Sequence, residues 1–266
     1  MNESHKYNLI YFHIPKCAGV SVRRAIGIDK KSHNFPFTNV SVALAIDVRA
    51  QTDDSVYNDF HKFSIVRNPY ERMVSLYNFR KKGNDLYTYD DMAESPVGPD
   101  GREWGFNEWI LSPEMKGTDR YGQDRMLSMS YFNAYWYFKS SGYAYPSNAG
   151  FREDTLRVDK PSYLGRNYLR THLEFLNQVD VLSNPFTGGR LMTDTIIRME
   201  NLEEEWNDMF TKLGYKAPSL KKHNTSKHTK TRTHYSHYYN DEAYEFVTKL
   251  FKKDLEFFGY EFEDKR

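Results

Sequence analysis

The sequence predicts a three-layer α/β fold, in which a central, mostly parallel β-sheet is flanked by helices. Twice, a short apolar run is followed by a turn and then by residues at helical spacing, first in residues 9–25 and again in residues 63–77. A third apolar run, at residues 195–199, precedes another amphipathic segment. Strands that alternate with helices form parallel sheets, because a crossover must carry the chain back before the next strand can run in the same direction.

The first strand and turn are predicted to bind an anion. Leu9 to Phe12 suit a buried parallel strand, and Gly19 lets the chain turn into a helix over residues 20–25. The N–H groups at the start of a helix attract anions, and Lys16 and Ser21 add an ammonium and a hydroxyl. Lys16 precedes Gly19, whereas the lysine of an ATP-binding Walker loop follows the second glycine of that loop. The segment therefore resembles a phosphate cradle but not that of an ATPase.

The second strand leads into a helix with clear start signals. Residues 63–66 read as the end of a strand, Asn68 is a favourable cap, and Pro69 suits the first helical position. Four residues at helical spacing are expected to pack this helix on the sheet, namely Tyr70, Met73, Val74 and Tyr77.

Arg67 stands between that strand and its helix, where a second anion is predicted to bind. Ligands of open parallel sheets gather outside the carboxyl ends of the strands. Arg67 can bind a phosphate through two parallel hydrogen bonds, and Ser75 can donate a third from the helix. Both segments are expected to face one crevice, which fits a ligand with two separated phosphates.

These segments resemble those of PAPS-dependent sulfotransferases, in the family that includes Golgi carbohydrate sulfotransferases and their bacterial relatives. Family members carry a segment similar to FxHIPKTGGTS for the 5′-phosphosulfate of PAPS (3′-phosphoadenosine 5′-phosphosulfate) and one similar to VRNPYERLVSxY for its 3′-phosphate. Here HIPKCAGVS matches the first, with Cys17, Ala18 and Val20 in place of Thr, Gly and Thr, and VRNPYERMVSLY matches the second almost throughout. The resemblance implies a P-loop-like sulfotransferase fold.

The resemblance also implies which residues bind PAPS. Arg67 and Ser75 would bind the 3′-phosphate. The residues for the 5′ end would be Pro15, Lys16, Cys17, Ala18, Gly19, Val20 and Ser21. Relatives often cover the nucleotide with a late basic or serine-containing loop, for which the candidates are Ser226, Lys227, Lys230 and Arg232. A solvated basic loop, or one that binds a polyanionic acceptor, is the alternative interpretation of these residues.

A third stretch extends the resemblance toward the carboxyl terminus. Residues 195–199 read as a strand, and the ENL of residues 200–202 precedes a helix that ends at Gly214. The apolar face of this helix consists of Leu202, Trp206, Met209, Phe210 and Leu213. The FGYEF of residues 258–262 resembles the end of the family's terminal helix. Residues 83–191 are largely unmatched.

The unmatched middle is the candidate acceptor-specificity insertion of a single domain, residues 1–266. A chain of 266 residues can bury one large core, and no repeat or long linker calls for a second domain. Aromatic residues make up 16% of the chain and are dense in residues 104–110 and 131–145. Because aromatic faces stack on sugar rings, a glycan-binding wall is one interpretation, and ordinary core packing is the other.

The chemistry that the resemblance implies is sulfuryl transfer from PAPS to a hydroxyl. Lys16 would offset developing negative charge, and no metal is implied. Some relatives have a base histidine where this chain has Asn39, which cannot accept the proton, so His33 and then His61 are the substitutes. His13 is expected to shape the first turn.

Two further side chains have less direct roles. Glu71 is expected to pair with Arg67 or Arg72 on the helix surface. The single cysteine, Cys17, is either an activated nucleophile or a small residue that the turn tolerates. One cysteine excludes an internal disulfide and agrees with a reducing compartment.

Composition restricts the partners. A net charge of +1 does not indicate a broad attraction to nucleic acid or membranes. No apolar run approaches the roughly 18 residues that would span a bilayer, and the first residues do not read as a signal peptide. Golgi relatives carry a membrane anchor, so a cytoplasmic enzyme or a trimmed chain is expected. The histidines of residues 223–237 lack the spacing of a metal site.

The function expected from the sequence is transfer of a sulfuryl group from PAPS to a carbohydrate or glycan-like acceptor. Neither the acceptor nor an oligomeric state can be read from the sequence. One alternative is a P-loop kinase-like phosphotransferase, in which Glu200 would hold Mg²⁺. Another is a catalytically inactive sulfotransferase-like nucleotide-binding protein, which the substitutions at residues 17, 18, 20 and 39 would suit.

Overall fold

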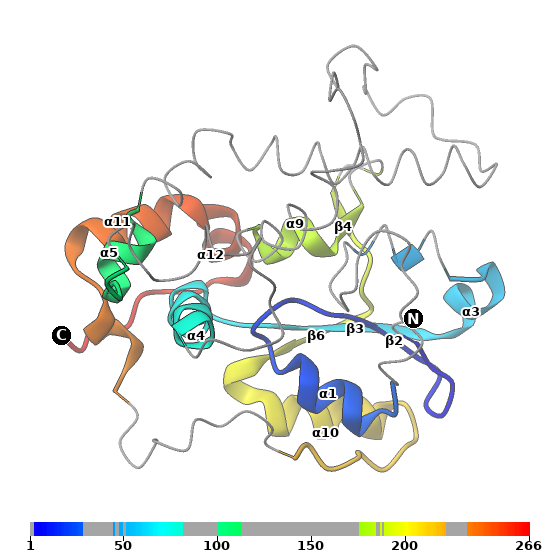
Figure 1. The fold of residues 1–266 in the computed structure, drawn as a ribbon. Helices are drawn as coiled ribbons and strands as arrows, with labels where there is room; N and C mark the ends of the chain where they lie inside the picture. Colours follow the sequence, from blue (N-terminus) through cyan, green and yellow to red (C-terminus); the bar gives the residue numbers. More distant parts are fainter. Residues whose placement is uncertain are drawn as a thin grey trace. The chain divides into compact units, whose positions relative to one another are not determined.

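A computed structural model of the chain describes residues 3–28, 45, 48, 49, 52–81, 101–112, 176–184, 187, 189–221 and 233–266 (Figure 1). These residues belong to two units. The first draws on Met1–Val66 and Asp124–Lys221, and the second on Arg67–Gln123 and Lys222–Arg266. Each unit therefore combines segments that are far apart in the sequence. The single domain expected from the sequence stays a prediction.

The first unit contains a four-stranded sheet in the order β1-β2-β3-β6. Its strands are β1 (Glu3–Ser4), β2 (Leu9–Phe12), β3 (His61–Val66) and β6 (Thr195–Arg198). The β2–β3 and β3–β6 pairs are parallel, whereas β1 and β2 are antiparallel. A mixed α/β fold with a mostly parallel sheet is thus confirmed, and β2, β3 and β6 are the three predicted strands.

Helices flank this sheet in the first unit. They are α1 (Gly19–Ala25), α3 (Asp54–Asp59), α9 (Gln178–Leu182) and α10 (Leu202–Lys212), with a 3-10 turn, η5 (Met199–Asn201), before α10. A short antiparallel pair, β4 (Ser183–Asn184) and β5 (Arg190–Leu191), follows α9. In Figure 1, α1 and α10 are drawn below the sheet and α9 above it.

The core of the first unit is a chain of aromatic rings that joins the sheet to α10. The ring of Phe63 on β3 stacks on Tyr11 of β2, with centroids 5.0 Å apart, and meets Trp206 of α10 edge-on at 5.9 Å. Phe210 continues the chain 4.7 Å from Trp206. These four side chains are buried, so the amphipathic face predicted for α10 is confirmed.

Helix α10 also ends where the sequence predicts. Gly214 has a φ of 78°, which a glycine adopts readily. The N–H of Tyr215 then donates to the carbonyl of Phe210 at 2.9 Å, as in a Schellman motif.

The second unit is helical in its described residues. It contains α4 (Pro69–Lys81), α5 (Phe106–Ile110), η6 (Tyr235–Tyr238), α11 (Asp241–Leu250) and α12 (Lys252–Phe258). The predicted cap of α4 is confirmed, because the side-chain oxygen of Asn68 accepts a hydrogen bond from the N–H of Tyr70 at 3.0 Å.

The predicted apolar face of α4 is buried, and its two tyrosine rings contact aromatic residues of the second unit. Tyr70 packs against Tyr235, Tyr239, Tyr244 and Phe262, and Tyr77 against Phe106, Trp109 and Tyr238. Phe106 is 5% exposed and Trp109 is 1% exposed. The rings of these two residues are therefore core, and the glycan-binding interpretation of residues 104–110 is wrong for them. Residues 131–145 lie outside the described residues.

A buried ion pair joins α4 to α12. Arg72 and Asp254 are both fully buried, and Nη1 of Arg72 lies 3.9 Å from Oδ2 of Asp254. The guanidinium of Arg72 also lies 5.4 Å from the ring centre of Phe251. Arg72 therefore serves the packing of the second unit rather than a ligand.

Candidate anion-binding site

The turn between β2 and α1 has the backbone of an anion cradle. Lys16 and Ala18 adopt left-handed conformations, with φ of 68° and 56°, and Gly19 begins α1 directly afterwards. A left-handed residue followed by a helical one turns successive N–H groups toward one point, which makes a concavity for an anion. Lys16 and Ser21 are half-buried beside it. This backbone is compatible with an anion such as a phosphate ester, and the binding role of the turn stays a prediction.

His13 explains why residue 19 is a glycine. A Cβ built on Gly19 would lie 1.8 Å from Nε2 of His13, far inside any contact that two atoms tolerate. The imidazole also stacks on Tyr11, with ring centroids 5.6 Å apart and planes 27° apart. His13 thus lies against the first residue of α1, in agreement with the expectation that it shapes the turn.

Cys17 is a packing residue of the turn. It is fully buried, and its Sγ lies 3.6 Å both from the carbonyl of Pro15 and from Oε1 of Gln178. The buried Tyr11 hydroxyl donates to the carbonyl of Cys17 at 3.3 Å, and burial raises the pKa of Tyr11 well above its usual value. Because the thiol is enclosed, the structure favours the tolerated small residue over the nucleophile.

Gln178, the first residue of α9, is a site residue that sequence reasoning missed. It is fully buried and contacts Cys17 from a segment 161 residues further along the chain. No motif marks it. The only signal is the burial of a polar side chain that must find a partner, which the sequence does not reveal.

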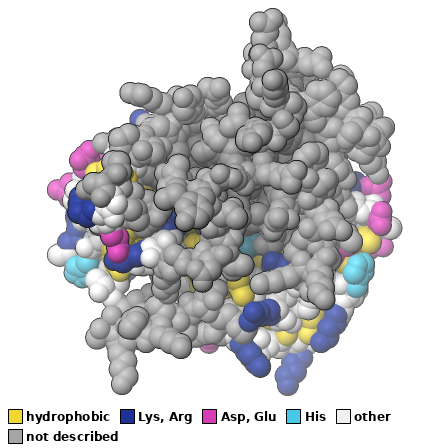
Figure 2. Space-filling view, viewed as in Figure 1, with side chains coloured by type: hydrophobic (Ala, Val, Ile, Leu, Met, Phe, Trp, Pro, Cys, Tyr) yellow, Lys and Arg dark blue, Asp and Glu magenta, His cyan; other side chains and the backbone are white. Residues whose placement is uncertain are grey.

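Exposed basic side chains lie at the carboxyl ends of α1 and α10. Lys and Arg side chains, dark blue in Figure 2, gather at the lower right, where Figure 1 draws α1 and α10. Arg24 of α1 and Lys212 of α10 are exposed. The cradle adjoins the amino end of α1, so neither side chain is part of it.

Arg67, the residue predicted to form the second clamp, belongs to the second unit. It is 5% exposed, and its Nη2 lies 2.7 Å from Oε1 of Glu71, one turn into α4. The expected pairing of Glu71 with Arg67 is confirmed. Ser75 is half-buried on α4. The expectation that both clamps face one crevice stays a prediction.

His61 does not lie beside the cradle. It is the first residue of β3 and pairs with Leu9 at the start of β2, whereas the cradle follows Phe12 at the other end of the same strand pair. Its Nε2 lies 2.8 Å from Oγ1 of Thr195, and burial lowers the pKa of His61. We therefore do not retain His61 as the base, because it lies at the amino end of the parallel sheet.

The other predicted groups lie outside the described residues. They are His33, Asn39, Ser226, Lys227, Lys230 and Arg232. Within the described ranges, no cluster of three or more His, Cys, Asp or Glu side chains could hold a metal ion. Nor do these ranges contain a helix that is long and apolar enough to span a membrane.

The sequence model of the sulfotransferase family matches residues 1–261, a range that includes the cradle, Arg67 and Ser75. No curated protein and no solved structure matches the chain.

Proposed function

Because the chain belongs to the sulfotransferase family, we propose that it transfers a sulfuryl group from PAPS to a hydroxyl of a carbohydrate or glycan-like acceptor. The observation that carries the donor assignment is the cradle, in which Lys16 and Ala18 are left-handed directly before α1. This backbone suits the 5′-phosphosulfate of PAPS. The acceptor assignment rests on the resemblance to carbohydrate sulfotransferases.

In this proposal the two clamps bind the two ends of one nucleotide. The cradle of residues 15–21 takes the 5′-phosphosulfate, and Arg67 with Ser75 takes the 3′-phosphate. Arg67 suits this role because a guanidinium pairs with phosphate through two parallel hydrogen bonds. Residues 226–232 form the proposed cover.

The residues of the cradle would promote the reaction electrostatically. PAPS supplies a sulfuryl group that is activated by its phosphate leaving group. Lys16 and the N–H groups of the turn would offset the negative charge that develops on that phosphate as its bond to sulfur breaks. The proton of the acceptor hydroxyl must pass to a base as its oxygen bonds to sulfur, and His33 is the candidate for this role.

The remaining assignments are proposals of the same kind. We propose a three-layer, P-loop-like fold, a single functional domain over residues 1–266, and an acceptor-specificity insertion over residues 83–191. A cytoplasmic location is a separate proposal, because the family also includes Golgi enzymes. A P-loop kinase and an inactive nucleotide-binding protein are the alternatives that the following experiment separates from it.

A transfer assay tests the proposed function. The purified chain, in EDTA, is incubated with sulfur-labelled PAPS and a panel of carbohydrates and hydroxyl metabolites, and in parallel with phosphorus-labelled ATP and Mg²⁺ on the same panel. Transfer of each label is measured. We expect transfer from PAPS, and we expect Lys16→Ala to lower the rate by about 10²- to 10³-fold, as the loss of one charge-stabilising donor does. Lys6→Ala, which removes an exposed lysine of the same unit, is the control.

Two results would overturn the proposal. Phosphate transfer from ATP that requires Mg²⁺, without transfer from PAPS, would support a kinase. Tight binding of the bisphosphate product without turnover on any acceptor would support an inactive binding protein.

A further inference from the structure

A tyrosine from the carboxyl-terminal part of the chain lies beside the second clamp. Tyr235, the first residue of η6, is 8% exposed, and its ring is parallel to that of Tyr70 within 7°, with centroids 6.4 Å apart. Its hydroxyl forms a hydrogen bond with the side chain of Asn68, which directly follows Arg67. The phenol oxygen therefore lies next to the start of α4.

The Tyr235 hydroxyl accepts one hydrogen bond and can still donate one. The backbone N–H of Glu263 donates to the phenol oxygen at 2.7 Å, and the side chain of Asn68 is a second hydrogen-bond partner of this hydroxyl. A phenol oxygen that accepts from an N–H keeps its own O–H as a donor. An anion at the second clamp would be a strong acceptor for that O–H.

The charges around Tyr235 keep the phenol protonated. Burial raises the pKa of Tyr235, and the negative charges of Glu263 and Glu71 act in the same direction. Glu71 is the partner of Arg67, so the phenol and the guanidinium are close to the same carboxylate. Tyr235 is therefore a neutral donor at physiological pH.

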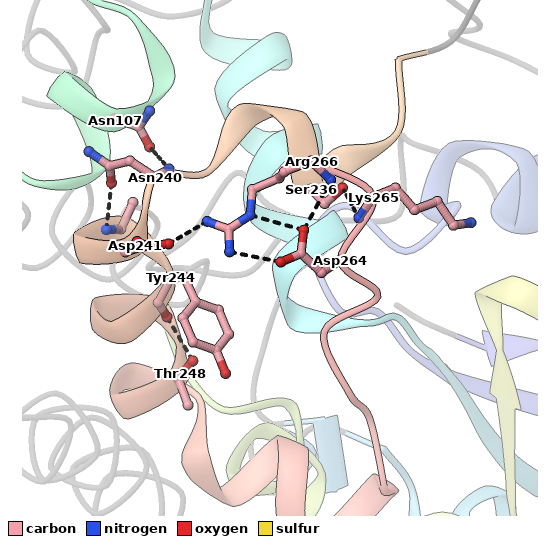
Figure 3. A network of polar contacts seen from close by, with 10 residues as sticks. Asn107, Ser236, Asn240, Asp241, Tyr244, Thr248, Asp264, Lys265 and Arg266 are labelled. Atoms are coloured by element: carbon pink, nitrogen blue, oxygen red, sulfur yellow. Dashed lines mark hydrogen bonds and ion pairs between the residues drawn. The ribbon is translucent and has the colours of Figure 1, made fainter.

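The carboxyl-terminal segment fixes the position of this donor. The N–H of Lys265 donates to the hydroxyl of Ser236 at 3.1 Å. Figure 3 shows this bond and the pairing of Arg266 with both Asp264 and Asp241. These bonds tie the end of the chain to η6 and to the start of α11. A donor that is held in place loses little freedom when a ligand binds.

We infer that the Tyr235 hydroxyl is a further binding group of the second clamp and donates a hydrogen bond to the phosphate monoester that Arg67 binds. The inference rests on the proposed function, since it concerns the 3′-phosphate of the same nucleotide. It adds to the site a residue from the end of the chain that belongs to neither predicted phosphate motif.

The test compares two tyrosines of one aromatic cluster by calorimetric titration. Tyr235→Phe removes the hydroxyl and keeps the ring. Tyr239→Phe is the matched control, because the hydroxyl of Tyr239 donates to the carbonyl of Tyr70 at 2.9 Å and its ring packs on Phe262. Each variant is titrated with adenosine 3′,5′-bisphosphate and with adenosine 5′-monophosphate, which lacks the 3′-phosphate.

The expected result is a selective loss. Tyr235→Phe should weaken binding of the bisphosphate roughly 10- to 100-fold, the usual effect of a hydrogen bond to a charged group, and leave the monophosphate affinity unchanged. Tyr239→Phe should bind both ligands like the wild type. In an Arg67→Ala background, Tyr235→Phe should cause little further loss, because both groups bind the same phosphate.

Other outcomes overturn the inference and separate it from the proposed function. If the wild type binds the bisphosphate and Tyr235→Phe binds it equally well, the inference fails while the proposed function stands. Equal losses for both phenylalanine variants, or additive losses with Arg67→Ala, would mean that Tyr235 acts only through the fold. If the wild type does not bind the bisphosphate, both are wrong.

Discussion

At the scale of single residues, the cradle contains a strained alanine. Ala18 has a φ of 56°, although the family segment that it resembles has glycine at this position. An L-residue in the left-handed region pays a steric penalty that glycine does not. The turn therefore persists although the backbone conformation at residue 18 is unfavourable for alanine. This indicates that neighbouring contacts, such as those of Cys17, stabilise the turn.

Replacing Ala18 by glycine should relieve this strain. We expect Ala18→Gly to raise the free energy of unfolding by about 1 kcal/mol, measured by urea denaturation. The matched control is Ala25→Gly, at the end of α1, where glycine should lower stability by about 0.5–1 kcal/mol. Destabilisation of similar size by both substitutions would contradict the strain at residue 18.

Predictions for single residues were right where adjacent residues in the sequence determine the local structure. Asn68 and Pro69 start α4, and Gly214 ends α10, because caps and backbone freedom depend on adjacent residues. It missed Gln178 and Tyr235, whose partners lie more than a hundred residues away in the sequence. Such pairs depend on tertiary packing, which no local pattern encodes.

At the scale of elements, β3 and β6 are joined by a histidine as well as by their ladder. His61 and Thr195 are hydrogen-bonded side by side, and Asp194 accepts from the N–H of Lys62 at 2.8 Å. Asp194 also lies 3.8 Å from Nδ1 of His61. The histidine is therefore part of the strand pairing at the amino end of the sheet.

This contact should make stability depend on pH. Burial lowers the pKa of His61 in the folded state, so below the unfolded-state value of about 6.5 the unfolded chain binds the extra proton more readily. We expect the wild type to lose stability as pH falls from 7.5 to 5.5, and His61→Gln to lose less over that range. Parallel urea denaturation curves measure this, and an equal pH slope in both proteins would show that His61 does not contribute.

Sequence patterns predicted which helices and strands form better than they predicted what those elements contact. The three parallel strands and the helices α1, α4 and α10 follow from apolar runs, helical spacing and turn residues. The sequence placed His61 on the strand that leads to Arg67, but not its pairing with Leu9, which puts it at the end of the sheet opposite the cradle. Nor did it distinguish a ring-rich core from a sugar-binding wall at Phe106 and Trp109, since both use the same residues.

At the scale of the whole molecule, the account depends on two clamps from two units. The cradle belongs to the first unit and Arg67 to the second, and Val66 and Arg67 are consecutive in the chain. The central claim is that one nucleotide with two phosphates binds to both. A ligand that binds only the folded state raises the melting temperature, by an amount that reflects its affinity.

The most direct measurement is a thermal-shift titration of the wild type, Arg67→Ala and Arg102→Ala with adenosine 3′,5′-bisphosphate and, separately, with ATP and Mg²⁺. Arg102 is the control, since it is an exposed arginine of the same unit that pairs with Glu108. We predict that the bisphosphate stabilises the wild type and Arg102→Ala, by about 2.7 kcal/mol at one hundred times its Kd, and that Arg67→Ala loses most of this effect. No shift with the bisphosphate, a larger one with ATP and Mg²⁺, or an undiminished shift in Arg67→Ala would contradict the two-clamp account.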